Sequence, residues 1–230
     1  MIARLLSLPS FLIGLVIYGL VSLGFWQLER ADEKQRIIDN RTLAQSLAPE
    51  QISNSSDLLK KEYHKVLLAG NYVDDSQFIY DNQTVNGNAG YYVLTPFVLS
   101  DHKAILINRG FVSWNGRRDS IGSINIGAQN RVIEVSLIKP VERMNLNEDL
   151  ISNVFPVLIQ SVNIGKISAL SNLDLVPIIG RLDKASEDGF YRKWQPFYGS
   201  IDKHLGYAFQ WFTMAFALFV ISLKLLIRSK

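Results

Sequence analysis

The residues with the clearest chemical potential lie near the C-terminus, in the stretch "KHLGYAFQWF" from Lys203 to Phe212. On a helix beginning near His204, the residues at +3, +4 and +7 share its face, and these are Tyr207, Ala208 and Trp211. A neutral imidazole is the usual proximal ligand of a haem iron. This face is therefore a candidate haem site, with His204 on the iron. The residues alone leave an alternative open, in which the same side chains form an interfacial belt that holds a helix at its depth in a bilayer.

The rest of the chain offers little for catalysis. There is no cysteine, which excludes thiol nucleophiles and cysteine zinc sites. His64 and His102 have no partner at metal-ligand spacing, and the chain contains no G-x-S-x-G elbow, P-loop or H-E-x-x-H motif. We expect a protein that acts by binding and is not an enzyme.

Two further segments are candidate binding sites. In "DNQTVNGNAGYY" the glycines Gly87 and Gly90 are typical of a turn between two strands, since Asn and Gly supply positive φ; a phosphate-binding loop is the alternative. Arg109 stands in "INRGFVSW", on a half-buried strand. A buried Arg usually satisfies a carboxylate or backbone carbonyls, although an anionic ligand would also suit it.

These residues must be positioned by two apolar segments that frame the chain. Residues 205–223 and residues 5–28 carry no charged side chain, and each is about long enough to cross a bilayer as a helix. A cleaved signal peptide has a shorter apolar core and a small-residue cleavage site, which "GFWQLER" does not provide. We therefore predict two transmembrane helices, with Gly14, Gly19 and Gly24 allowing them to approach closely.

The distribution of charge predicts the orientation of the chain. All 21 acidic residues and all but four of the 24 basic ones lie between the apolar segments. The other four are on the short tails: Arg4, Lys224, Arg228 and Lys230. Short basic tails favour the cytoplasm, so we expect both termini there, including a tail at 224–230, and the main domain in the periplasm. A basic balance confined to the tails does not indicate nucleic-acid binding.

Residues 29–203 are expected to form one β-rich domain. A helical extension of the first span is predicted at about 29–47, a loop at 48–57 and a short helix at about 164–173. Between and after them are short runs rich in Val, Ile, Tyr and Phe, separated by turn residues, which we expect to be strands; the last of them is residues 190–197. The predicted fold class is an α+β membrane protein, with two transmembrane helices flanking an antiparallel, sandwich-like or barrel-like extracytoplasmic domain.

Five short segments stand out along the chain: "LGFWQLERADEK" after the first span, "GNY" at residues 70–72, "GYYVLTPF" and "INRGFV" in the middle, and "HLGYAFQWF" entering the second span. Together they resemble the Surfeit locus protein 1 family of cytochrome c oxidase assembly proteins. Their order and the two-span frame carry the resemblance from end to end. The family usually has Trp where this chain has Phe111, and residues 113–190 match only loosely.

The resemblance implies an assembly factor that binds haem a and helps deliver it to oxidase subunit I in a bacterial inner membrane. It implies that the haem ligand is the histidine of the "HLxYAxQWF" motif, here His204, with Trp211 in the same motif. Besides subunit I and the lipid bilayer, haem a synthase is a further implied partner. The alternative is a structural chaperone that holds subunit I without binding haem.

Overall fold

The computed structural model describes residues 8–114, 121–140, 154–194 and 200–228. The chain divides into two compact units. The first contains residues 1–40 and 195–230, and the second contains residues 41–194. Arg4 and Lys230, on which the predicted orientation partly depends, lie outside the described residues.

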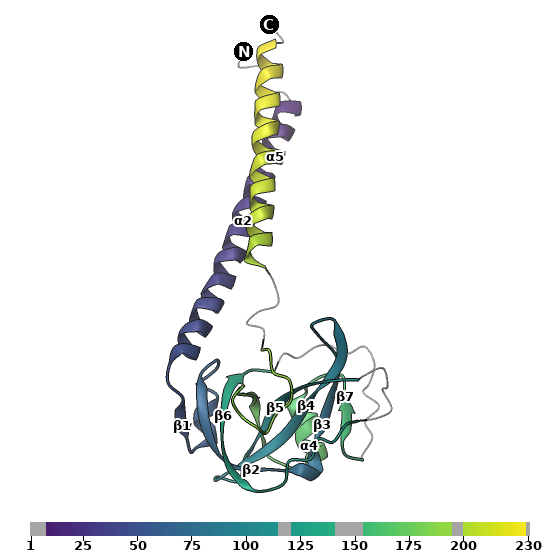
Figure 1. Cartoon of the computed structure of the whole chain (residues 1–230). Coiled ribbons are helices and arrows are strands. Elements are labelled where there is room, and N and C mark those ends of the chain that lie inside the picture. Colours follow the sequence, from purple (N-terminus) through teal and green to yellow (C-terminus); the bar gives the residue numbers. More distant parts are fainter. Residues whose placement is uncertain (1–7, 115–120, 141–153, 195–199, 229–230) are drawn as a thin grey trace. The chain divides into compact units, whose positions relative to one another are not determined.

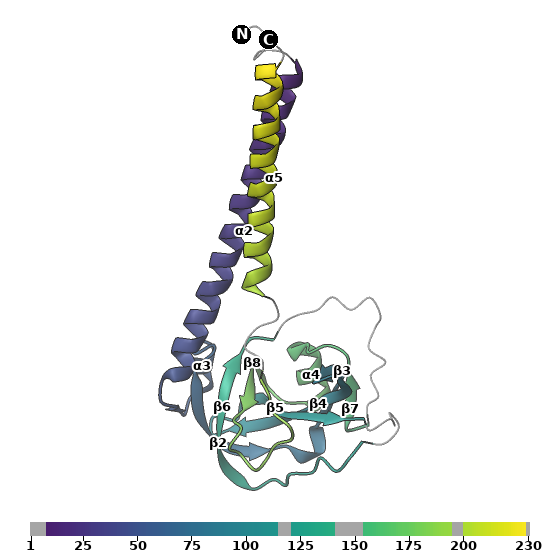
Figure 2. The ribbon, with the colours of Figure 1, turned by 45° about the horizontal axis from the view of Figure 1, so that its top comes forward.

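The first unit contains α5 (Ile201–Arg228) and all but the last residues, 41–46, of α2 (Leu8–Ser46), and these two long helices lie side by side (Figures 1 and 2). They run antiparallel, and both are long and apolar enough to cross a membrane. A helix in a soluble core would be mostly buried, but the apolar window of each helix is only 6% buried. A helix that exposes apolar side chains on most sides is stable where its surroundings are also apolar. The exposed apolar side chains of the helix pair therefore indicate a membrane protein.

The helices pack closely at Gly24 of α2. A Cβ atom on Gly24 would lie 2.6 Å from Cε1 of Phe212 on α5. The same phenyl ring meets Phe25 edge-on, with 5.3 Å between ring centroids. Among the described residues, nothing lies within 4 Å of the Cβ positions of Gly14 and Gly19. The prediction that all three glycines serve the helix contact is therefore wrong for these two, because a small residue permits close approach only where its helix face meets the partner.

Within the described residues, strands of the second unit form a closed ring of hydrogen-bonded neighbours (Figure 1). In order around the ring they are β2 (Lys65–Tyr72), β6 (Asn130–Ile138), β8 (Leu175–Leu182), β5 (Ala104–Ser113) and β4 (Asn88–Leu99). The ring is extended at its edges by β1 (Glu50–Ile52) beside β2, by β3 (Phe78–Val85) beside β4, and by β7 (Val157–Ile159) beside β3. The predicted class, two apolar helices flanking a β-rich, barrel-like domain, is confirmed.

The ring closes where β2 meets β4, at the segment "GNY". Gly70 pairs with Leu99, and Tyr72 pairs with Phe97. A Cβ atom on Gly70 would lie 2.0 Å from the carbonyl oxygen of Val98. A backbone oxygen inside a sheet has no room to move away, so the closure requires glycine at this position.

Strand β5 stands between two hydrophobic cores. Ile105 and Ile107 belong to the core inside the ring, whereas Leu106 belongs to a second core, which also contains Ile167 of helix α4 (Ile164–Ser171). This division follows from the alternation of side chains along a strand. Each fully buried aliphatic side chain stabilises the fold by about 1.5–3 kcal/mol. The strand that carries Arg109 is thereby fixed on both faces.

The structure differs from the predictions in three places. The segment expected as a loop at 48–57 contains β1 and the short helix α3 (Ser55–Leu58), which begins after the capping residue Asn54. The sheet is mixed, because β1–β2, β3–β7 and β5–β8 pair in parallel. The strand expected at 190–197 is reduced, in its described part, to a single bridge between Tyr191 and Phe111.

The helix expected at about 164–173 is present in the structure as α4.

Candidate functional site

His204 lies in the first turns of α5 and is held by two side chains of α2. Its Nδ1 atom is 2.7 Å from Oε1 of Gln27, and its Nε2 atom is 2.7 Å from Nζ of Lys34. Gln27 and Lys34 are seven residues apart, or two helical turns, so they occupy the same face of α2. Gln27 is buried, and His204 and Lys34 are half-buried. The imidazole thus bridges two positions of the partner helix.

The partners decide which ring nitrogen carries the proton. A lysine ammonium only donates hydrogen bonds, so Nε2 of His204 accepts from Lys34. A neutral imidazole then carries its proton on Nδ1, which donates to the Gln27 amide oxygen. The orientation of the Gln27 amide is consistent with this assignment. Its oxygen atom faces Nδ1 of His204, and its nitrogen atom could not accept the hydrogen bond from the Nδ1–H group. His204 therefore has its lone pair at Nε2, one of the two ring atoms through which an imidazole can bind a metal.

The predicted helical face around His204 is divided in the structure. Ala208 is buried at 1% exposure, whereas half of Tyr207 is exposed. Trp211 is half-buried. His204 makes its hydrogen bonds to α2, so helical spacing along α5 alone did not identify its partners.

The other histidines serve local structure. Nδ1 of His64 lies 3.0 Å from the carbonyl oxygen of Glu62. His102 has a φ of 63° in the turn between β4 and β5. Among the described residues, no three His, Cys, Asp or Glu side chains gather to hold a metal ion. A haem iron needs no such group, because a single imidazole can hold it.

The second polar centre of the molecule is Arg109, in the barrel domain. Its side chain is 4% exposed. Nε donates to the carbonyl oxygen of Asp188 over 2.8 Å, while Nη1 donates to the carbonyl oxygen of Ile124 over 2.6 Å and to Oε1 of Gln77 over 3.0 Å. Burial lowers the pKa of the Arg109 guanidinium. The interpretation that this arginine satisfies backbone carbonyls is confirmed.

Tyr72 lies beside this centre, with its hydroxyl group buried. The guanidinium of Arg109 is 5.8 Å from the centroid of its ring. Among the described residues, no group forms a hydrogen bond with the Tyr72 hydroxyl, although the side chain is 1% exposed. Burial raises the pKa of this hydroxyl, with a further contribution from the Asp188 carboxylate, while Arg109 and Arg131 oppose the shift. Arg131 also forms an ion pair with Asp188.

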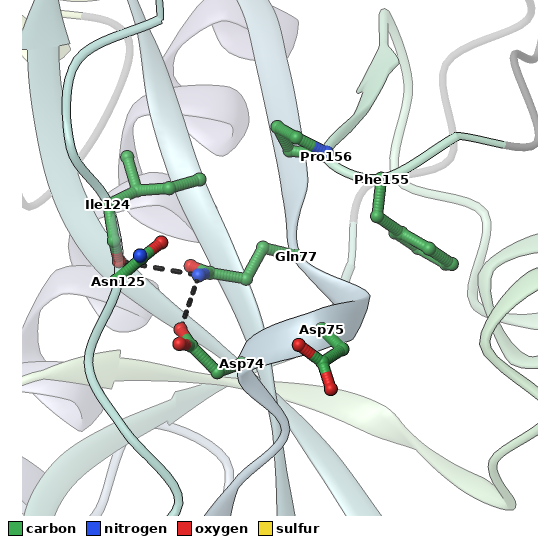
Figure 3. Close-up of a pocket in the computed structure, with 7 residues that line it drawn as sticks. All are labelled: Asp74, Asp75, Gln77, Ile124, Asn125, Phe155 and Pro156. Atoms are coloured by element: carbon green, nitrogen blue, oxygen red, sulfur yellow. Dashed lines mark hydrogen bonds between the residues drawn. The ribbon is translucent and has the colours of Figure 1, made fainter.

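A pocket of about 230 Å³ opens near Gln77 in the same domain (Figure 3). Its lining consists of Asp74, Asp75, Gln77, Ile124, Asn125, Phe155 and Pro156. Nε2 of Gln77 donates to Oδ1 of Asp74 over 2.8 Å and to the carbonyl oxygen of Ile124 over 3.3 Å. The lining contains neither an imidazole nor a cationic side chain, so it lacks the groups expected to bind haem iron and propionates.

The glycine-rich segment is a tight hairpin turn between β3 and β4. Asn86 and Gly87 have φ values of 51° and 81°, the left-handed pair that two-residue hairpins require. Gly90 lies further along β4 and pairs with Ser113. A Cβ atom on Gly90 would lie 2.2 Å from the carbonyl oxygen of Val112. The turn interpretation is confirmed, and Gly90 is needed for strand packing.

Comparison with known proteins identifies the family. A family model described as the SURF1 family matches residues 14–216. The chain belongs to the SURF1 family. A SURF1-like protein of Rickettsia conorii is 27% identical over 230 residues, covering 92% of this chain and 88% of that protein. A SURF1-like protein of Rickettsia felis is 29% identical over 220 residues, covering 88% of this chain and 89% of the relative.

A shorter match reaches a eukaryotic relative. The cytochrome oxidase assembly protein SHY1 of Saccharomyces cerevisiae is 32% identical over 95 residues, which are 40% of this chain and 24% of the yeast protein.

The segments that carry the SURF1 resemblance gather at two places. "LGFWQLERADEK" supplies Gln27 and Lys34, and "HLGYAFQWF" supplies His204, so these two segments meet in the helix pair. "GNY" and "INRGFV" supply Tyr72 and Arg109, which meet in the barrel. Gln27 and Lys34 were not predicted as partners of His204. Their spacing of seven residues was the available signal, because it places two polar side chains on one face of a helix that is largely apolar.

Proposed function

We propose that this SURF1 family member is an assembly factor for cytochrome c oxidase, which binds haem a through Nε2 of His204 and assists its delivery to oxidase subunit I. The family and the name of the yeast relative support the assembly role. The protein acts in this role by binding, without catalysing a reaction. Subunit I, and haem a synthase as the source of the haem, are the proposed partners.

The observation that carries the proposal is the hydrogen bond from His204 Nδ1 to Gln27. A histidine that binds a metal usually donates its other ring N–H to an oxygen acceptor, which fixes the ring and raises the basicity of the ligating nitrogen. Gln27 supplies this acceptor from a buried position. The bound haem supplies an iron with an open coordination position for the imidazole. The chain supplies the oriented ring, and Tyr207 and Trp211 are the proposed apolar neighbours of the macrocycle.

The non-haem chaperone is supported by a different observation. Both nitrogens of the His204 ring are engaged by α2, as expected if its role is to fasten the helix pair. If the protein is such a chaperone, the helices hold subunit I while other proteins insert the haem. The two functions differ in whether Nε2 of His204 becomes available to iron.

The proposed location is a bacterial inner membrane, with both termini in the cytoplasm and the barrel domain in the periplasm. The basic residues of the tails favour this orientation, including Lys224 and Arg228 at the end of α5. A reporter fused to either end of the chain tests it. Alkaline phosphatase activity from a C-terminal fusion would contradict the proposed orientation, because that enzyme requires an oxidising compartment for its disulfides.

Haem a titration in detergent tests the ligand role. We expect the wild-type protein and a His102→Ala control to give the same haem spectrum, since His102 lies in a hairpin turn. His204→Ala should lose the histidine-ligated spectrum, and His204→Met should shift it. Equal binding by wild type and His204→Ala, or by neither, would contradict the haem proposal.

Association with the oxidase tests the assembly role separately. Tagged subunit I should co-purify with the wild-type protein. If it does so equally well with His204→Ala, and the wild type binds no haem, the chaperone alternative is favoured. Absence from the pull-down, together with intact oxidase in a deletion strain, would contradict both functions.

A further inference from the structure

Lys34 occupies the nitrogen of His204 that a haem iron would require. The ammonium nitrogen lies 2.7 Å from Nε2, and an imidazole Nε2 has one lone pair, which cannot serve a hydrogen-bond donor and a metal at once. We propose that Lys34 is a displaceable cap on His204, so that the Lys34–His204 hydrogen bond and iron ligation exclude each other. This inference rests on the proposed haem function, but the cap itself can be tested without haem.

The helix geometry allows Lys34 to leave while the ring stays in place. Side chains of a helix lean toward its N-terminus, so Lys34 reaches back along α2 to a ring that Gln27 holds two turns earlier. Gln27 is short and buried, whereas Lys34 is long and half-buried. A lysine ammonium is flexible and strongly hydrated, so it returns readily to water. Gln27 is then the positioning residue and Lys34 the removable one.

The Lys34 cap reduces the affinity for haem by a factor that depends on the strength of the Lys34–His204 hydrogen bond. When a ligand binds only a minor state of a protein, its apparent affinity is the intrinsic affinity multiplied by the fraction of molecules in that state. Hydrogen bonds that involve a charged group have the strength to hold the capped form at roughly ten to one hundred times the uncapped form. Removal of the Lys34 donor should therefore tighten haem binding by up to that factor.

The first test uses diethyl pyrocarbonate, a reagent that acylates the free lone pair of imidazole. Wild type and Lys34→Met are treated in detergent, and modification of His204 is followed by mass spectrometry of its peptide, with His102 as the internal reference. Met keeps most of the length of the side chain and removes the donor. We expect His204 to react at least severalfold faster in Lys34→Met. Equal rates in the two proteins would overturn the cap.

The control separates the cap from a general effect of charge. Lys203 is the exposed neighbour of His204 on α5, and Lys203→Met removes the same charge without removing the hydrogen bond. It should leave the rate of His204 modification close to that of wild type. A rate as high as that of Lys34→Met would also overturn the cap, because charge alone would then explain the change. Lys34→Arg, which keeps a donor at this position, should retain slow modification.

The second test measures competition, with ferric haem b as the probe and the Soret band as the readout. Lys34→Leu removes the donor without adding a thioether that could itself bind iron. It should bind more tightly than wild type by roughly tenfold or more, and the gain should disappear in Lys34→Leu/His204→Ala. Unchanged or weaker binding by Lys34→Leu, with a histidine-ligated wild type, would overturn competition. If no variant binds haem while Lys34→Met accelerates acylation, the haem function fails and the cap stands.

Discussion

The ring of Phe212 fills the space that a side chain at position 24 would occupy, 2.6 Å from the Cβ position of Gly24. The atoms in conflict belong to the outer part of the phenyl ring, which can turn by a small amount. Room for one methyl group can therefore be made, but room for a branched side chain cannot. This contact makes Gly24 a sensitive point of the helix pair.

We predict that Gly24→Ala is tolerated and that Gly24→Leu separates the helices. Overpacking of a tight contact costs about 1–3 kcal/mol. Because the chain has no cysteine, spin labels can be placed on cysteines introduced at the exposed positions Tyr18 and Phe219. The distance distribution between them should broaden in Gly24→Leu. Gly19→Leu, with no described atom within 4 Å of its Cβ position, should match wild type. A distribution unchanged in Gly24→Leu would disprove the contact.

Gly70→Ala is expected to destabilise the barrel. The added methyl group would lie 2.0 Å from the Val98 carbonyl oxygen, and this oxygen belongs to the backbone of β4. We expect a loss of about 1–3 kcal/mol in the free energy of unfolding, seen as a lower denaturation midpoint by tryptophan fluorescence. Gly122→Ala is the matched control, since nothing described lies within 4 Å of its Cβ position. Equal midpoints for the two variants would count against closure at Gly70.

Replacement of Arg109 should cost more than replacement of a surface arginine. Arg109→Met leaves the carbonyl oxygens of Asp188 and Ile124 without their donor, at about 1–3 kcal/mol for each buried group. Arg109→Lys should rescue little, because an ammonium cannot reproduce the guanidinium fork. In Arg36→Met the lost ion pair with Asp32 is exposed, so the change should be within about 1 kcal/mol. Chemical denaturation of the three variants distinguishes these outcomes.

The buried hydroxyl group of Tyr72 should make the folded protein less stable in alkali. Because burial raises its pKa in the folded state, the folded protein keeps the phenolic proton when the unfolded chain has lost it. The contribution of Tyr72 to the free energy of unfolding is complete below about pH 10, which is the ordinary pKa of a tyrosine. Above that pH the free energy of unfolding falls by about 1.4 kcal/mol per pH unit. Tyr72→Phe should reduce this decline and leave stability at pH 7 unchanged or higher, since the hydroxyl has no described partner. Unfolding curves between pH 8 and 11 test this; an identical alkaline slope would refute it.

The sequence was sufficient to predict the features that depend on neighbouring residues. The charge-free segments predicted the apolar helices, and turn residues between Val-rich and Ile-rich runs predicted most of the strands. Asn86 and Gly87 indicated their hairpin because positive φ is a local requirement. Arg109 was assigned correctly from its place on a buried strand. In each case the cause of the structure lies within a few residues.

Features that depend on distant residues were not predictable in this way. The parallel pairing of β5 with β8 joins residues such as Leu106 and Ile179, and nothing in either segment specifies the direction of its partner. Gly14 and Gly19 have the same composition signal as Gly24, but only the last faces Phe212. His204 was recognised as a candidate ligand, whereas its bond to Lys34 depends on how two helices pack.

The place of β8 in the ring determines when the barrel can form during synthesis. This strand lies between β5 and β6, although it follows both of them in the chain. Until residues 175–182 have been made, β5 and β6 each have a backbone edge open to other strands. Such long-range pairing also forms slowly, because a large loop must close first. The nascent domain therefore remains an incomplete sheet, open to aggregation, until β8 is made, shortly before α5.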